Sequence, residues 1–460
     1  MIILTSKIEG YIHKMNKSLT EGIIWKQLLF FALPIFFSSI FQHIYNIVDS
    51  AIVGHYVGTA AFAAISSAGY IVCIVITFFV GISTGTGIIV SHFYGANDSE
   101  SIHKAIRTTV TLSLAAGLIL TLIGIWISPN IVHWTKTPEE VVPYSIPYIK
   151  IYFLGTVPVL LYNLGSGVLR ACGDSKRPLY FLILSSILNV FLDVVFVVLF
   201  RWGVEGAALA TIISQTFSAL LVLGALIFRK PVYKIDSIRS LFDISIFKKI
   251  LIVGVPVGLQ STIGILGHLI MNTKTNELGM AAIASVNAVG KINNIAWLSV
   301  TAIGHATVTF VGQNIGAGKG SRVDTGVKTA LWMSAGYSLL MSFVVYIFRK
   351  ELIAIFITDP TTVETSLTVL YHIAPFYILF AVANIYTCAI SGTGNTFIPM
   401  LINMFCYCFL RVVLMLVFMP IWPDVRLVAL CYPISWAAAL AASYFYYHFS
   451  KHKETPAISF

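Results

Sequence analysis

The chain has 460 residues, of which 57% are hydrophobic and only 10% are charged, less than half the share of about a quarter in a soluble domain. Twelve membrane helices of about 20 residues each would use about 240 apolar positions, which this composition supplies. No stretch is long and polar enough to fold alone, which excludes a cytosolic enzyme with a membrane anchor. Continuous rather than alternating apolar runs argue against an outer-membrane barrel.

Apolar runs long enough to cross a bilayer recur along the whole chain and predict twelve membrane helices. The first six fall at residues 25–49, 58–91, 105–128, 142–169, 179–200 and 205–228. The second six fall at residues 247–272, 278–312, 323–348, 363–390, 396–420 and 427–449. Several runs are longer than a straight crossing needs, so we expect tilt or kinks at the prolines within them, Pro34, Pro158, Pro256 and Pro375.

Polar stretches between the runs divide the chain into five expected parts. These are a cytoplasmic N-terminal segment at 1–24, a first lobe at 25–228, a cytoplasmic linker at 229–246, a second lobe at 247–449 and a cytoplasmic tail at 450–460. With the N-terminus inside, 20 Lys and Arg residues fall on the inner side and 6 on the outer side. This asymmetry predicts cytoplasmic termini in a bacterial or archaeal inner membrane. The net charge of +10 is thus a topology signal, and no nucleic-acid partner is expected.

The two halves of the chain repeat each other at an offset of 221 residues. Polar and turn residues coincide at this offset without a gap: Asn163 with Asn384, Gly173 with Gly394, and Pro178 with Pro399. Each half holds an even number of expected helices, so both halves enter the membrane from the same side. We therefore expect an all-α membrane protein of two parallel six-helix lobes, related by a pseudo-two-fold axis along the membrane normal. We expect a monomer that binds its substrate between or within the lobes.

Two acidic residues, Asp49 and Asp193, lie well inside the predicted apolar layer. A carboxylate at the bilayer centre costs about 2.5–3.5 kcal/mol on insertion scales, so its presence requires a reason. Asn189 precedes Asp193 by one helical turn on the same face, and Thr211 in the next span lies at a similar depth. The corresponding positions of the second half carry no acid, so the first lobe alone is expected to hold an ion site.

Two kinds of coupling ion fit these residues. Two close carboxylates in a low dielectric do not both ionise freely, which suits a proton carrier. Together with the oxygens of Asn189 and Thr211, the carboxylates of Asp49 and Asp193 also suit a hard cation such as Na⁺. The residues leave the choice between H⁺ and Na⁺ open. Pro34, in the same span as Asp49, removes a backbone hydrogen bond and is the candidate gate.

These features resemble the multidrug and toxic compound extrusion (MATE) transporters, in the branch similar to the DNA-damage-inducible protein F group. The resemblance rests on the two six-helix halves and on positions that match the ion-site pattern of that branch: Pro34, Asp49, Asn189, Asp193 and Thr211. It adds Asn163, in the fourth span, as a polar residue lining the same lobe. It implies export of organic, often cationic, compounds in exchange for H⁺ or Na⁺. The sodium-driven branch places acids in the seventh and tenth spans, and here only Glu277 stands at the end of the seventh.

Three cations and two aromatic residues are further candidates. Lys291 in the eighth span fits the substrate cavity, where it would favour an anionic or zwitterionic compound, an internal ion pair, or a side chain that reaches to the interface. Lys150, near the outer end of its span, fits a side chain that reaches to the interface, and Arg411 fits a structural partner. Tyr45 and Phe153 are candidate cavity-lining residues, since rings can bind flat or cationic ligands.

The alternative to an efflux antiporter is a flippase for lipid-linked oligosaccharides or peptidoglycan precursors, which would use the same three cations to bind pyrophosphate. Enzyme motifs have no support. Gly81-Ile82-Ser83-Thr84-Gly85 matches G-x-S-x-G but lies within an apolar helix rather than at a strand-to-helix turn. The glycine-rich stretch 316–321 lacks the spacing of a phosphate-binding loop. We expect a transporter rather than an enzyme, with no cofactor besides its coupling ion.

Overall fold

The computed structural model describes residues 18–135, 137–228 and 242–450, without the side chains of residues 60, 66–73 and 450. The predicted N-terminal segment, linker and tail lie mostly outside these described residues. Within them the chain is helical and contains no strand. The prediction of an all-α membrane fold is confirmed.

The described helices of the first half follow the predicted spans in order. They are α2 (Ile24–Tyr56), α3 (Thr59–Gly95), α4 (Ser99–Trp134), α5 (Val142–Leu154), α6 (Thr156–Ala171), α7 (Lys176–Asp193), the π-helix η1 (Val194–Leu199) and α8 (Gly203–Phe228). α2 continues through Pro34 without interruption and runs beyond Asp49, so this carboxyl lies within the helix rather than at its end.

The second half repeats the pattern with more breaks. Its helices are α9 (Ile244–Asn276), α10 (Met280–Gly316), α11 (Gly320–Ile347), α12 (Arg349–Ala354), α13 (Pro360–Ile373), the 3₁₀ helix η2 (Ala374–Phe376), α14 (Tyr377–Gly392), α15 (Phe397–Asn403), the π-helix η3 (Met404–Phe409), α16 (Leu410–Phe418) and α17 (Val425–Ser450). The 3₁₀ turn contains Pro375, one of the expected kink sites.

Eleven described helices or continuous helical runs are long and apolar enough to cross a membrane. α5 and α6 form one further span that bends by 48° between Leu154 and Thr156. Counting this bent pair as one crossing gives the predicted twelve. The break comes one turn before Pro158, where the proline cannot donate a backbone hydrogen bond to the preceding turn.

Two helices begin several residues before the apolar runs that predict them, and each has an aspartate cap. Asp98 accepts a hydrogen bond from the Ser101 N–H at 3.0 Å at the start of α4. Asp359 accepts one from the Thr362 N–H at 2.9 Å at the start of α13. Hydrogen bonds from Thr361 and Thr362 lower the pKa of the exposed Asp359 carboxyl to about 2. Such caps satisfy backbone N–H groups that a helix start leaves unpaired, so the helices extend beyond the hydrophobic layer.

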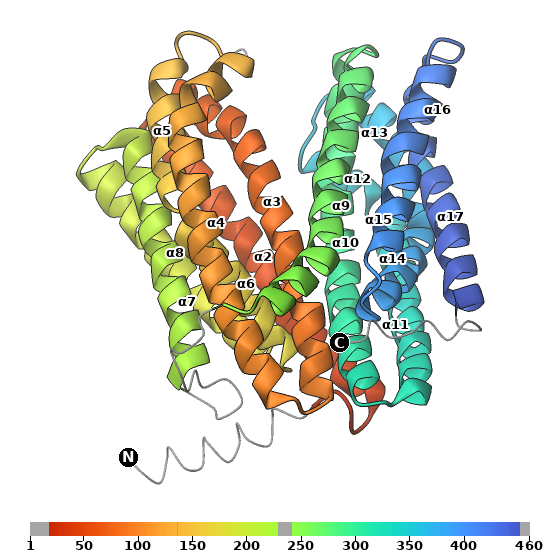
Figure 1. Cartoon of the computed structure of the whole chain (residues 1–460). Coiled ribbons are helices and arrows are strands. Elements are labelled where there is room, and N and C mark those ends of the chain that lie inside the picture. Colours follow the sequence, from red (N-terminus) through yellow and green to blue (C-terminus); the bar gives the residue numbers. More distant parts are fainter. Residues whose placement is uncertain (1–17, 136, 229–241, 451–460) are drawn as a thin grey trace. The chain divides into compact units, whose positions relative to one another are not determined.

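The two halves pack their helices alike. In the first half α6 packs against α3, α4 and α8, and in the second half α14 packs against α10, α11 and α17. In each half the fourth span therefore contacts the second, third and sixth. This common arrangement is the structural counterpart of the sequence repeat, and Figure 1 shows the two sets of helices in red to lime and in green to blue.

The chain forms two compact units whose limits differ from the predicted lobes. Unit 1 contains residues 34–258, and unit 2 contains residues 19–33 and 259–460, as far as these are described. By its contacts, the chain is divided within the first helix of each half, α2 directly before Pro34 and α9 directly after Gly258. Hydropathy could not reveal this division, because it depends on which neighbours each half-helix contacts. The predicted lobes, joined by a linker at 229–246, stay a prediction.

Paired glycines explain why the first part of α9 belongs to unit 1. A Cβ atom on Gly81 of α3 would lie 2.4 Å from the Cα of Gly258, and one on Gly85 would lie 2.3 Å from the Cα of Gly254. Each helix thus presents a G-x-x-x-G face that allows the two backbones to approach closely. The Gly81–Gly85 pattern that resembles a hydrolase motif in sequence is a helix-packing motif.

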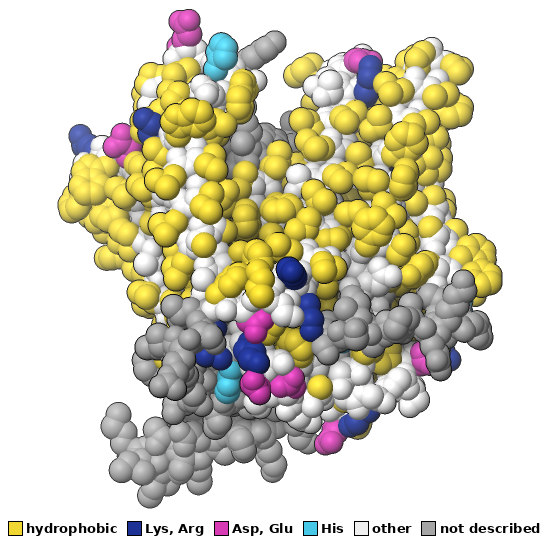
Figure 2. Space-filling model, in the orientation of Figure 1, with side chains coloured by type: hydrophobic (Ala, Val, Ile, Leu, Met, Phe, Trp, Pro, Cys, Tyr) yellow, Lys and Arg dark blue, Asp and Glu magenta, His cyan; other side chains and the backbone are white. Residues whose placement is uncertain are grey.

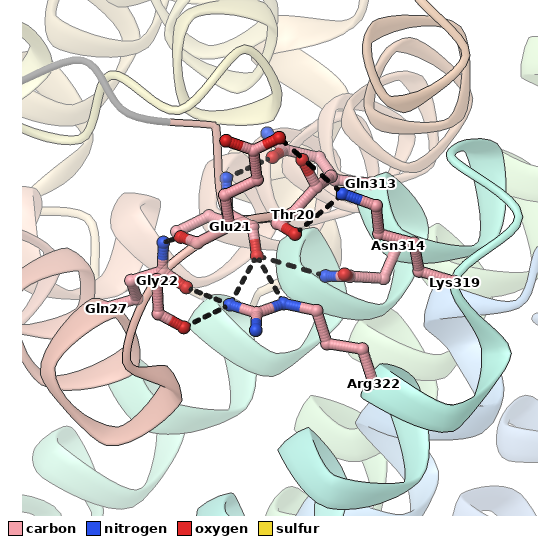
Figure 3. Close-up of polar contacts among 9 residues, drawn as sticks. Thr20, Glu21, Gly22, Gln27, Gln313, Asn314, Lys319 and Arg322 are labelled. Carbon is pink, nitrogen blue, oxygen red and sulfur yellow. Dashed lines mark hydrogen bonds and ion pairs between the residues drawn. The ribbon is translucent and has the colours of Figure 1, made fainter.

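The segment before α2 is bound to unit 2 by side chains around the turn between α10 and α11 (Figure 3). Arg322 Nη2 donates to Gln27 Oε1 at 2.7 Å, and Arg322 Nε donates to the Leu19 carbonyl at 3.4 Å. Asn314 Nδ2 donates to the same carbonyl at 3.2 Å, while the Leu19 N–H donates to Gln313 Oε1 at 2.9 Å. These bonds account for the placement of residues 19–33 in unit 2.

Replacing Arg322 with glutamine should loosen this segment. Hydrogen bonds to a charged group contribute about 1.5–3 kcal/mol each, so hydrogen exchange at the Leu19 amide should accelerate about tenfold or more. Hydrogen–deuterium exchange with mass spectrometry measures the effect. The matched control is Lys328→Gln on the same helix, where the side chain is exposed. Equal exchange in the two variants would contradict the role of Arg322.

The surface has the distribution of a membrane protein. On the face shown in Figure 2, hydrophobic side chains cover the middle of the helices and most charged side chains gather toward their ends. Large apolar residues in the middle of spans are exposed, such as Ile47 at 68% and Leu122 at 71%. Such exposure is favourable only against lipid, so the chain is a multi-pass membrane protein.

Candidate ion-binding site in unit 1

Unit 1 brings the two membrane acids together. Asp49 on α2 and Asp193 on α7 have carboxyl groups within hydrogen-bonding reach of each other. Asp193 has no exposed surface, and Asn189, one turn earlier on α7, is 1% exposed. Three of the predicted ion-site residues thus converge from two helices, away from lipid.

The polar atoms of this group lack partners. Asp49 Oδ1, both carboxyl oxygens of Asp193 and both amide atoms of Asn189 are shielded and have no hydrogen-bond partner among the described residues. An unpaired buried polar group costs about 1–3 kcal/mol, and more when it is charged. Two carboxylates are both acceptors, so neither satisfies the other unless one of them carries a proton. A bound proton or small cation would give these unpaired atoms a partner. The polar atoms of Asp49, Asp193 and Asn189 therefore form an acceptor set for a positive ion.

The local sequence places Asp193 at a change of helix type. α7 ends at Asp193, and the π-helical stretch η1 begins with Val194. Four valines occupy this six-residue stretch, and β-branched side chains crowd the preceding turn of a regular α-helix. π-helical turns inside α-helices often occur at functional sites, since the wider turn changes the direction of the side chains that flank it.

Tyrosines surround the acid pair. Tyr45 lies one turn before Asp49 on α2 and interacts electrostatically with it. Tyr148 on α5 is within electrostatic range of both Asp49 and Asp193. Sequence analysis selected Tyr45 as a cavity-lining residue but missed Tyr148. Tyr152, one turn after Tyr148 in the fourth span, has its ring 6.0 Å from that of Tyr148 and interacts electrostatically with Tyr45.

Thr211 and Asn163 are less directly connected to the acids. The Thr211 hydroxyl donates to the Ala207 carbonyl at 3.0 Å, which leaves its oxygen lone pairs available. The Asn163 amide donates to the Val159 carbonyl at 2.8 Å on its own helix. No hydrogen bond joins either side chain to the two carboxyls among the described residues. α8, which carries Thr211, packs directly against α7, so Thr211 remains a candidate ligand.

The other candidates have different surroundings. Phe153 is 4% exposed and belongs to a packed core with Ile149 and Val197. Its ring lies so close to Gly124 that a Cβ atom at that position would clash with it. The structure therefore places Phe153 in the core of unit 1 rather than at a cavity wall. Pro34 is the first residue of α2 that belongs to unit 1, and its role as a gate stays a prediction.

The three membrane cations also differ from one another. Lys150 is exposed, as expected for a side chain that reaches to the interface. Lys291 is exposed as well, and its ammonium lies 5.3 Å from the centroid of the Phe356 ring in unit 2. Only Arg411 is buried, and its partner is Ser435 on α17.

The repeated six-span pattern and the shielded acceptor set define the class of this protein, a polytopic membrane transporter. The MatE family model matches residues 34–195 and again residues 256–417, and the chain belongs to this family. The double match also supports the internal duplication predicted from the sequence.

Relatives and solved structures agree with this assignment. The chain is 29% identical over 435 residues to the probable multidrug resistance protein YpnP of Bacillus subtilis (strain 168), covering 94% of this chain and 97% of that protein. It is 25% identical over 375 residues to the multidrug export protein MepA of Staphylococcus haemolyticus (strain JCSC1435), covering 82% and 83%. It matches the outward-facing conformation of a multidrug resistance MATE family transporter of the MOP superfamily with a TM-score of 0.88 and 21% identity, covering 95% and 98%. This last likeness confirms the fold.

Proposed function

We propose that this protein is a secondary-active efflux antiporter that exports organic, often cationic, compounds in exchange for H⁺ or Na⁺. The observation that carries the proposal is the shielded acceptor set of Asp49, Asp193 and Asn189, which lacks a positive partner. The names of the multidrug relatives support the substrate class. Binding and release of one positive ion at this set would couple the ion gradient to export.

The energy of an ion gradient across the membrane is sufficient to drive export. One elementary charge moved through about 100 mV is worth about 2.3 kcal/mol, roughly a 50-fold concentration ratio of a neutral substrate. The coupling ion must also bind weakly enough to be released. Two carboxyls that compete for one proton or one cation allow such reversible binding. Tyr45 and Tyr148, beside the acids, would keep lipid away from the bound ion.

The proposal includes a location and an oligomeric state. The charge asymmetry of 20 inner to 6 outer basic residues supports cytoplasmic termini in the inner membrane of a prokaryote. A monomer would suffice, because the acceptor set lies wholly within one chain. A flippase for lipid-linked sugars has less support, since it would gather several cations around one pyrophosphate. In unit 2 Lys291 and Arg411 have different neighbours, Phe356 for one and Ser435 for the other.

Efflux from everted membrane vesicles tests the proposal and selects the coupling ion. A pH gradient and a Na⁺ gradient are imposed separately, and accumulation of a fluorescent cationic dye is followed. We expect accumulation with one of the two gradients, collapse when that gradient is dissipated, and no response to ATP alone. Accumulation that requires ATP, or that neither gradient drives, would contradict an antiporter.

A further inference from the structure

Unit 2 buries a cation without a counter-charge. Arg411 on α16 is 5% exposed, and its Nε donates to Ser435 Oγ on α17 at 2.8 Å. Its guanidinium carbon lies 4.3 Å from the ring centroid of Tyr432 and 5.4 Å from that of Tyr407. No carboxylate forms an ion pair with it anywhere in the described ranges. A buried charge without an opposite charge is costly, so this arrangement requires an explanation.

The donor capacity of the guanidinium is mostly unused. Arginine carries five N–H donors, and only the one on Nε has a hydrogen-bond acceptor among the described residues. The faces of the two tyrosine rings attract the positive charge but accept no strong hydrogen bond. The two terminal nitrogens of Arg411 are therefore available to an acceptor from outside the described chain.

A second unpaired donor belongs to the same cluster of rings. Trp297 Nε1 on α10 is shielded and has no acceptor within the described residues. The Trp297 ring contacts that of Trp436 with centroids 6.1 Å apart, and Trp436 contacts Tyr432 at 5.9 Å. His268 on α9 is also within electrostatic range of Arg411. One unpaired donor, the indole N–H of Trp297, thus belongs to the same aromatic cluster as the guanidinium.

This polarity is the opposite of that in unit 1. There, most of the unpaired buried atoms of Asp49, Asp193 and Asn189 are acceptors. Here the groups without a partner among the described residues are donors, the terminal nitrogens of Arg411 and the indole N–H of Trp297. The sequence offset of 221 residues makes Tyr432 the counterpart of Thr211 and Leu410 the counterpart of Asn189, directly before Arg411. The fifth span of each half therefore carries unpaired acceptors in the first half, at Asn189 and Asp193, and an arginine with unused donors in the second, at Arg411.

We propose that the Arg411 cluster is a binding site for one small anionic group, either a free halide ion or a carboxylate. The terminal nitrogens of the guanidinium can hold such a group in a bidentate manner, and the indole N–H of Trp297 can supply a further hydrogen bond. The surrounding rings of Tyr407 and Tyr432 exclude water and lipid, which strengthens the attraction. The site is independent of the cation site in unit 1.

Thermal unfolding of the purified full chain in detergent tests the site. Chloride, formate and gluconate are compared as sodium salts at equal ionic strength, since gluconate is too large for a shielded site. Chloride or formate should raise the Tm by about 2 °C or more relative to gluconate, because a ligand that binds only the folded state stabilises it. A response to chloride alone identifies a halide site, and a response to both identifies a site that also accepts carboxylates.

The variants decide whether Arg411 is responsible. Arg411→Gln should abolish the anion-dependent rise in Tm. The matched control is Arg349→Gln, because Arg349 also lies over two tyrosine rings, at 4.9 and 5.5 Å, but is only partly buried, whereas Arg411 is 5% exposed. An equal rise in Arg411→Gln, or no rise in the unmodified protein, would overturn the proposal.

Two conservative variants test the same site if Arg411→Gln does not fold. Arg411→Lys retains the charge but loses the planar pair of donors, and Trp297→Phe removes only the indole N–H while keeping an aromatic ring. Each should raise the anion concentration needed for half of the stabilisation by about tenfold. Unchanged half-saturation in both variants would show that neither group binds the anion, and the proposal would fail.

Discussion

Asp49→Asn and Asp193→Asn should each abolish gradient-driven efflux while leaving folded protein in the membrane. Asparagine has nearly the shape of aspartate but is neutral in every state, so it cannot alternate between a charged and a compensated form. Removing a buried charge is often neutral or stabilising, so the amount and the Tm of the protein should not fall. Dye accumulation in everted vesicles should drop to the level of vesicles without the transporter.

A matched acid variant separates loss of coupling from a general loss of negative charge. Glu277 follows α9, is exposed and pairs with Lys274 at 2.6 Å. Glu277→Gln should therefore retain efflux close to that of the unmodified protein. Normal drug efflux in both aspartate variants would remove the acid pair from the mechanism.

Gly85→Ala should destabilise the protein severely, since the new methyl group would lie 2.3 Å from the Cα of Gly254. This neighbour is backbone and cannot rotate away, so α3 and the first part of α9 would have to separate. Overpacking of this kind costs about 1–3 kcal/mol, and we expect a value at or above the upper end. Size-exclusion chromatography and the Tm of the detergent-purified protein measure the loss.

Gly224→Ala is the matched control for this glycine. Gly224 lies within α8 of the same unit, and a Cβ atom there meets nothing within 4 Å. Alanine in a helix interior is more favourable than glycine by about 0.5–1 kcal/mol, so this variant should be as stable as the unmodified protein or slightly more stable. Equal stability of the two alanine variants would show that α3 and α9 do not depend on backbone contact.

Much of the fold was accessible from hydropathy. The predicted span at 105–128 lies inside α4, and the predicted span at 427–449 nearly equals α17. The bend after Leu154 lies one turn before Pro158, one of the expected kink sites. What hydropathy missed is the π-helical turn after Asp193, because local crowding of β-branched side chains leaves no signal in average hydrophobicity.

The site was predicted in part for a clear physical reason. Ionisable residues are so costly in an apolar layer that Asp49 and Asp193 stand out in the sequence, and the structure places them together. Aromatic residues are too common in membrane spans to be sorted in this way. Phe153 was therefore selected and Tyr148 was missed, although both belong to one packed core and only Tyr148 interacts electrostatically with both acids. Only the folded arrangement distinguishes them.

Counting the cations bound by the purified protein tests the central claim most directly. Radioactive Na⁺ uptake and proton release or uptake are measured together on the unmodified chain and on the Asp49→Asn/Asp193→Asn double variant. We expect one saturable cation site per chain, filled by the ion whose gradient drives efflux and absent from the double variant, because the oxygens of these two residues have no other partner among the described residues. A site that survives in the double variant with unchanged affinity would place the coupling ion elsewhere and contradict the account.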